Sequence, residues 1–275
     1  MITSRSSAPG APSSTSATPA PTGASAPGQT PGLPTASFNG DRMRLTAVLM
    51  LLGGLSQLPL ALLHPHHEQP NDSRAAFAEY ARSTDWVWVH LGEYLGTLLL
   101  ALGLVSLAVS LARQRGVAGQ LGRLAVVAAV VTAAVFAVQM AVDGIALKAA
   151  VDNWAAASDA NQAAAYDVAD AIRATEKGLS ALFHLNNAVT LLALGVAMMG
   201  SRAHRILGCA GAAAGAGFFV VGALTARTGF SPEASTVAVA PTLLLLVFLL
   251  GSARALWIGD FPIEGSVASR GTDPR

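Results

Sequence analysis

The sequence predicts an all-α protein: a polytopic transmembrane helical bundle of six spans, preceded by a disordered N-terminal tail. The composition is 52% hydrophobic and only 12% charged, about half the charged share of an ordinary globular protein. Beyond Arg44 the chain has six apolar stretches, each long enough to cross about 30 Å of hydrocarbon as a helix. Residues 1–42 are dominated by Ala, Pro, Ser, Thr and Gly, a composition with too little apolar surface to offset the entropy of ordering.

These features divide the chain into a cytoplasmic tail (1–42), a six-helix transmembrane domain (43–258) and a short cytoplasmic C-terminal tail (259–275). The spans are expected at about 45–63, 87–111, 124–147, 179–200, 206–226 and 236–256. The four tryptophans, Trp86, Trp88, Trp154 and Trp257, all fall at or near span ends. Amphipathic indoles prefer the membrane interface, so their positions support the spans independently of hydropathy.

Basic residues orient the bundle. The loops on one side of the predicted spans contain Arg42, Arg44, Arg113, Arg115, Arg123, Arg202, Arg205 and Arg254. Excess Arg and Lys in short loops is typical of the cytoplasmic side, so both termini are predicted to be cytoplasmic. Because the Ala-, Gly- and Arg-rich composition is typical of a GC-rich bacterium, the expected location is the bacterial plasma membrane.

Two segments outside the membrane are long enough to form structure. Asn71, Asp72 or Ser73 could cap a short helix over 75–82 through a side-chain oxygen. Residues 152–178 carry apolar side chains at helical spacing. This second helix is expected either to cover the outer end of the bundle or to extend a span.

Charge and cysteine content narrow the choice of partners. The net charge is +1, which argues against nucleic acid as a partner, and the lipid bilayer is the expected one. The single cysteine, Cys209, excludes an intramolecular disulfide framework and a CxxC redox centre. Two GxxxG patterns, Gly92/Gly96 and Gly211/Gly215, let helix backbones approach closely. These faces are expected to pack helices of one chain together, or to contact a second copy of the chain or another protein of a membrane complex.

Ionisable groups gather toward the outer ends of three spans. His90 and Glu93 share one face of the second span, Asp143 lies near the end of the third, and His184 lies in the fourth. All are about 5–9 Å inside their span ends, where isolated exposure to lipid is unfavourable. We therefore expect them to meet in an outward-facing pocket for a cation, a proton or a small polar ligand, with Asn187 and Lys148 as further ligand-binding candidates.

Neutral imidazole with carboxylate suits zinc, copper or iron, so a divalent metal is a candidate although no cofactor is predicted. The metal candidates are His90, Glu93, Asp143 and His184. His64, His66 and His67, which belong to the sequence His-Pro-His-His-Glu, form a weaker set because their spacing matches no defined site and a solvated loop explains them. Haem is disfavoured, because two histidines across a bundle are a weak signal.

Two other functions remain open. In one, the polar cluster only locks the bundle of a structural or assembly subunit of a membrane complex. In the other, the protein is a metal-dependent or serine-type intramembrane enzyme, with Ser56 or Ser180 as nucleophile. The non-enzymatic interpretation is preferred and no catalytic residue is assigned, because neither serine has an obvious base with an orienting acid.

Three stretches carry a resemblance to a group of known sequences. They are Trp86 to Gly96 (Trp-Val-Trp-Val-His-Leu-Gly-Glu-Tyr-Leu-Gly), Ala141 to Lys148 leading to Trp154, and Arg205-Ile-Leu-Gly208. With these stretches the chain resembles uncharacterised six-span integral membrane proteins of bacteria. The resemblance could extend over 44–257 and implies the fold, without an activity.

Overall fold

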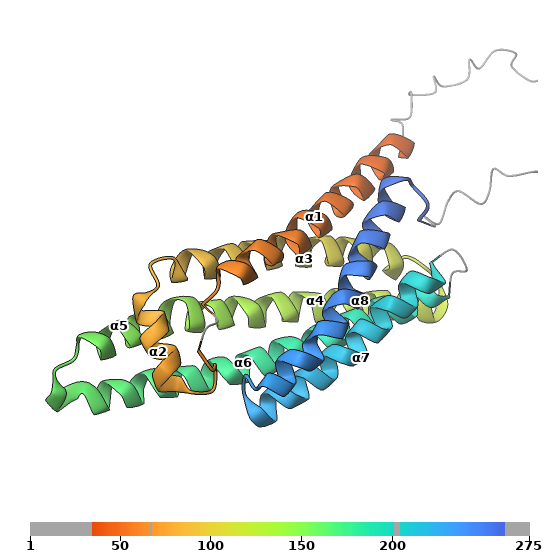
Figure 1. Ribbon diagram of the computed structural model, residues 1–275. Helices are drawn as coiled ribbons and strands as arrows, with labels where there is room; N and C mark the ends of the chain where they lie inside the picture. The colour runs from red at the N-terminus through yellow and green to blue at the C-terminus, as the bar shows by residue number, and fades with distance from the viewer. Residues whose placement is uncertain (1–34, 66–67, 201–203, 262–275) are drawn as a thin grey trace, which may run out of the picture. The chain divides into compact units, whose positions relative to one another are not determined.

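The computed structural model describes residues 35–65, 68–200 and 204–261, and every regular element in these ranges is helical (Figure 1). The helices are α1 (Thr35–Leu63), α2 (Ser73–Arg82), α3 (Trp86–Ala112), α4 (Gly116–Met140), a π-helical segment η1 (Ala141–Leu147), α5 (Lys148–Ala156), α6 (Asp159–Met199), α7 (Arg205–Thr228) and α8 (Pro232–Trp257). Six helical stretches are long and apolar enough to cross a membrane. The predicted all-α architecture with six spans is thus confirmed.

The helices are longer than the apolar stretches that predicted them. The third span belongs to one uninterrupted helical stretch over Gly116–Ala156, and the fourth to α6, which begins at Asp159. The segment 152–178 therefore mostly extends a span. At the N-terminus α1 begins at Thr35, so the last residues of the predicted tail are helical. The rest of that tail and most of the C-terminal tail (262–275) lie outside the described residues.

The short helix α2 forms as predicted, because the Asp72 carboxylate accepts the backbone N–H of Ala75 at 3.1 Å and so caps its first turn. This helix packs against α5 (Figure 1). Phe77 of α2 lies in one buried cluster with Trp86 and Trp154. We call this the α2 end of the bundle.

Glycines set the distance between neighbouring spans. A Cβ added to Gly53 of α1 would lie 2.2 Å from the backbone nitrogen of Leu100 in α3, and one added to Gly96 would lie 2.3 Å from the side chain of Gln57. Similarly, a Cβ on Gly215 of α7 would lie 2.8 Å from the backbone nitrogen of Leu192 in α6. The two GxxxG faces thus contact helices of the same chain, and contact with another protein through them stays a prediction.

Large apolar side chains also cover the outside of the spans. Val127, Val130 and Val131 of α4 and Leu243 and Val247 of α8 are all exposed. A soluble protein rarely exposes so many large apolar side chains on its helices, whereas lipid tails solvate them. The outer surface of the helices therefore suits contact with a bilayer.

Candidate metal centre

Three residues from different elements converge at the α2 end. His64 follows the last residue of α1, His90 lies in the second turn of α3, and Asp143 lies in η1. One ring nitrogen of each histidine and one carboxylate oxygen of Asp143 all lie within 4.8 Å of one another. His90 is 1% exposed and Asp143 is 6% exposed. We refer to these three residues as the His64 cluster.

Hydrogen bonds hold the two buried members in place. Nε2 of His90 lies 3.1 Å from Oδ2 of Asp143, and its Nδ1 lies 2.7 Å from the backbone carbonyl of Trp86. The indole Nε1 of Trp86 in turn donates to the backbone carbonyl of Asp143 at 3.1 Å. The side chain of Trp86 thus links α3 to η1, while its backbone carbonyl orients the His90 imidazole against the carboxylate.

The exposed side of the cluster is closed by His64. Its ring packs against those of Trp86 and His90, with both centroid distances at 5.1 Å, and its Nδ1 lies 2.9 Å from the backbone carbonyl of Pro65. Burial lowers the pKa of His64 below its ordinary value of 6.5, and the neighbouring His90 lowers it further. His64 is therefore a neutral imidazole at pH 7, the form that binds metals.

Charges from α6 lie next to the cluster. The Glu176 carboxylate is close enough to Asp143 for the two to interact electrostatically, and it pairs with Arg173 at 2.5 Å. Glu176 and Arg173 are 2% and 3% exposed. The second carboxylate oxygen of Asp143, Oδ1, is buried and has no hydrogen-bond partner within the described ranges. One oxygen of the cluster is thus left with unused acceptor capacity.

The Arg173 guanidinium ties this layer to α2. Its Nη2 donates to the Tyr80 hydroxyl at 2.9 Å and to the backbone carbonyl of Pro70 at 3.3 Å, and it lies 4.7 Å from the ring centroid of Phe230. The Tyr80 ring stacks near Trp86 with centroids 4.2 Å apart. Burial raises the pKa of Tyr80 to about 12. Next to the cluster there are therefore a neutral phenol, that of Tyr80, and a cation, that of Arg173, whose charge is paired with Glu176.

The candidates from the sequence divide into two groups. His90 and Asp143 meet directly, and Glu93 interacts electrostatically with both. Lys148 instead pairs with Asp152, four residues along the same helix. His184 does not join the cluster either. Its ring stacks on Phe218 of α7 at a centroid distance of 5.7 Å.

Asn187 lines a cavity farther along the bundle. His66 and His67 lie outside the described residues.

The functional residues least visible in the sequence are His64, Arg173 and Tyr80. The loop sequence placed His64 with its neighbouring histidines, and no pattern in the sequence singles it out. In the structure Gly92 and Gly96 contact residues of α1, so α1 and α3 run side by side, and His64, just after α1, lies near the start of α3. No local signal indicates Arg173 or Tyr80 either.

Comparison with known protein families, with characterised proteins and with solved structures finds no match. The resemblance to six-span bacterial membrane proteins therefore stays a prediction. A function for this chain has to be derived from the geometry of the His64 cluster.

Proposed function

We propose that this is a multi-pass protein of the bacterial plasma membrane that binds a divalent transition-metal cation at the extracytoplasmic end of its bundle. His64, His90 and Asp143 are the ligands. The observation that carries the proposal is the convergence of their three ligand atoms within 4.8 Å. Zinc binds imidazole nitrogen and carboxylate oxygen at about 2.0–2.2 Å, so two ligand atoms of a tetrahedral site lie about 3.3 Å apart. Small side-chain movements would bring the cluster to that spacing.

The orientation of His90 supports a cation. Because its Nδ1 lies 2.7 Å from a backbone carbonyl, Nδ1 carries the proton and Nε2 presents a lone pair in the neutral ring. That lone pair faces the Asp143 carboxylate oxygen at 3.1 Å. Two acceptors at this distance repel unless a proton or a metal lies between them. An N–H at Nδ1 that donates to a backbone carbonyl is also the usual support of a metal-binding histidine.

The charge balance also supports a cation. The potentially opposing charges of Arg173 and Lys148 are paired with Glu176 and Asp152 respectively. When both imidazoles are neutral, the carboxylates of Asp143 and of the nearby Glu93 leave net negative charge at this end of the bundle. A divalent cation would compensate this charge, and the unbonded Oδ1 of Asp143 offers it a further oxygen.

Three protein ligands leave one position of a tetrahedral site open. A closed structural site uses four protein ligands, so this cluster would leave the fourth position to water or to another small ligand. Cation binding at this cluster is the non-enzymatic function proposed here.

The test measures zinc in the full chain, purified in detergent without a histidine tag, incubated with zinc chloride and desalted. We expect about one zinc per chain by elemental mass spectrometry, and almost none in His90→Ala, Asp143→Asn or His64→Gln. His184→Phe is the matched control, because this histidine stacks on Phe218 away from the cluster, and it should retain the metal. Equal zinc in all variants, or none in the native chain, would refute the proposal.

A second candidate function is a structural lock. The 3.1 Å separation of Nε2 and Oδ2 also fits a hydrogen bond between an imidazolium and a carboxylate. In that case Asp143→Asn lowers the melting temperature and zinc has no effect on the native chain. Binding instead predicts that zinc raises the melting temperature of the native chain and leaves that of Asp143→Asn unchanged.

A further inference from the structure

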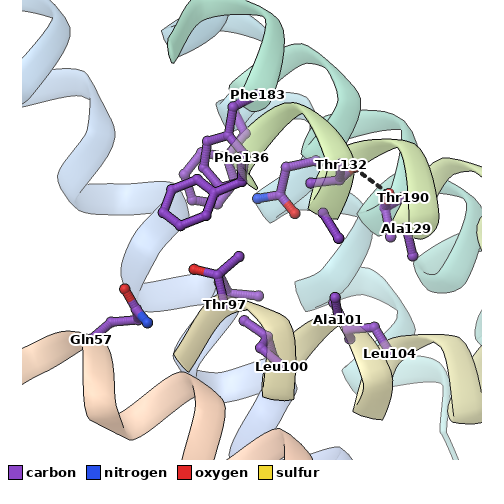
Figure 2. A pocket seen from close by; sticks show the side chains of 14 residues that line it. Gln57, Thr97, Leu100, Ala101, Leu104, Ala129, Thr132, Phe136, Phe183 and Thr190 are labelled. Atoms are coloured by element: carbon purple, nitrogen blue, oxygen red, sulfur yellow. Dashed lines mark hydrogen bonds between the residues drawn. The ribbon is translucent and has the colours of Figure 1, made fainter. Parts of the chain in front are cut away.

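A cavity of about 200 Å³ lies between the spans (Figure 2). It is bordered by Thr97 to Leu104 of α3 and by Ala129 to Phe136 of α4, both near the middle of their helices, and residues of the other four spans complete it. No member of the His64 cluster lines it. The cavity is therefore a separate feature at the depth of the hydrocarbon core.

Its walls are mostly apolar. Phe136 and Phe183 lie on one side of the space and Leu100 on the opposite side (Figure 2), and Phe218 adds a third aromatic ring. None of the described residues that line it is Asp, Glu, Lys, Arg or His. Because an uncompensated charge is costly at this depth, the walls select an uncharged occupant.

Some of the polar groups in the wall have hydrogen-bond partners and others do not. Thr132 and Thr190 hydrogen-bond to each other at 3.2 Å. The Thr97 hydroxyl and the Asn187 side-chain amide, by contrast, make no hydrogen bond within the part of the chain that the structure describes. The Gln57 amide nitrogen donates to the Glu93 carbonyl at 3.2 Å, while its oxygen remains available. Unpaired polar groups in hydrocarbon are unfavourable. The free polar atoms of Thr97, Asn187 and Gln57 therefore favour a ligand that carries hydrogen-bonding atoms.

We infer that this cavity binds an uncharged, lipid-soluble molecule that has one ring and at least one hydroxyl or carbonyl oxygen. A cavity of about 150 Å³ already holds benzene, so the volume here accommodates a single substituted ring. The phenylalanines contact the face or edge of the ring. Thr97 and Asn187 hydrogen-bond its oxygen. The ligand reaches the site from the bilayer, because the cavity lies at hydrocarbon depth.

The probe is 4-fluorophenol, with fluorobenzene as the comparison ligand lacking the hydroxyl group. Binding to the full chain in detergent micelles is followed by fluorine-19 NMR, with empty micelles as the reference for partitioning. We expect saturable binding of 4-fluorophenol. Thr97→Val and Asn187→Leu, which remove the hydrogen bonds but keep the bulk, should each weaken it about fivefold.

A cavity-filling pair of variants locates the site. Ala101→Leu places extra carbon atoms in the cavity, which Ala101 lines (Figure 2), and it should abolish saturable binding. Ala240→Leu is the matched control, because Ala240 is an exposed residue in α8 and does not line the cavity; it should bind like the native chain. Melting temperatures of all variants verify that they fold.

Three results would overturn the inference. Saturable binding that survives in folded Ala101→Leu would place the ligand elsewhere. If fluorobenzene bound as tightly as 4-fluorophenol, the polar atoms of the cavity wall would make no contribution to binding. That result is expected for a cavity that holds a lipid chain. Absence of saturable binding in the native chain would leave the cavity without a ligand of this class.

Discussion

Gly144 of η1 lies directly against His90 of α3: a Cβ added to Gly144 would stand 2.5 Å from the Cβ of His90. No real pair of Cβ atoms approaches so closely, so any side chain at position 144 must push α3 and η1 apart. Asp143, the partner of His90, precedes this glycine in the chain. The close backbone approach at Gly144 therefore sets the distance at which the imidazole meets the carboxylate.

Gly144→Ala should separate His90 from Asp143. We expect a loss of about 1–3 kcal/mol of stability, as in other overpacked sites, and zinc binding weakened about 10–100-fold, as when a residue that supports a metal ligand is changed. Melting temperature and zinc titration measure the two effects. Gly178→Ala is the control, because its added Cβ would meet nothing within 4 Å; native zinc affinity in Gly144→Ala would contradict this prediction.

Gly53→Ala should disrupt the packing of α1 on α3. The new Cβ would meet the backbone nitrogen of Leu100 at 2.2 Å, and a backbone atom cannot move aside as a flexible side chain can. The two helices must separate, which we expect to destabilise the chain by about 1–3 kcal/mol or more. Unfolding in a denaturing detergent measures the loss. Gly178→Ala, which gains helix propensity without a clash, should be at least as stable as the native chain.

Arg173→Met should be strongly destabilising, because it leaves the Glu176 carboxylate buried without its partner. Removing one member of a buried ion pair costs about 3–5 kcal/mol. Arg173→Met/Glu176→Leu removes both charges and should recover much of the loss. A double-mutant cycle of unfolding free energies gives the coupling between the two residues. Additive effects of the two single changes would show that the pair contributes no coupling.

Tyr80 should make stability sensitive to high pH. Burial raises its folded-state pKa to about 12 from 10, so the folded state holds the phenolic proton more tightly than the unfolded state. The stabilisation is complete below pH 10 and is lost as the pH rises toward 12, by about 2–3 kcal/mol. Unfolding free energies at pH 8, 10 and 11.5 measure the loss. Tyr80→Phe should lack this part of the pH dependence; an identical profile in the variant would assign it to another group.

Local sequence determined much of this protein. The six spans could be predicted because a helix that crosses hydrocarbon needs a long run of apolar residues, which is visible without knowing its neighbours. The start of α2 could be predicted because Asp72 caps it through a contact only three residues along the chain. Gly92 and Gly96 predicted close helix packing, although the pattern itself did not identify α1 as the partner helix.

Tertiary structure decided which polar groups meet. His90, Asp143 and His184 lie at similar predicted depths, yet the ring of His184 stacks on Phe218 while His64, from outside the spans, contacts His90. Depth follows from position along one helix, whereas a meeting between side chains depends on how each helix is rotated and which helix lies beside it. Those two quantities are set by packing between segments distant in sequence, such as Gly144 against His90 and Gly53 against Leu100.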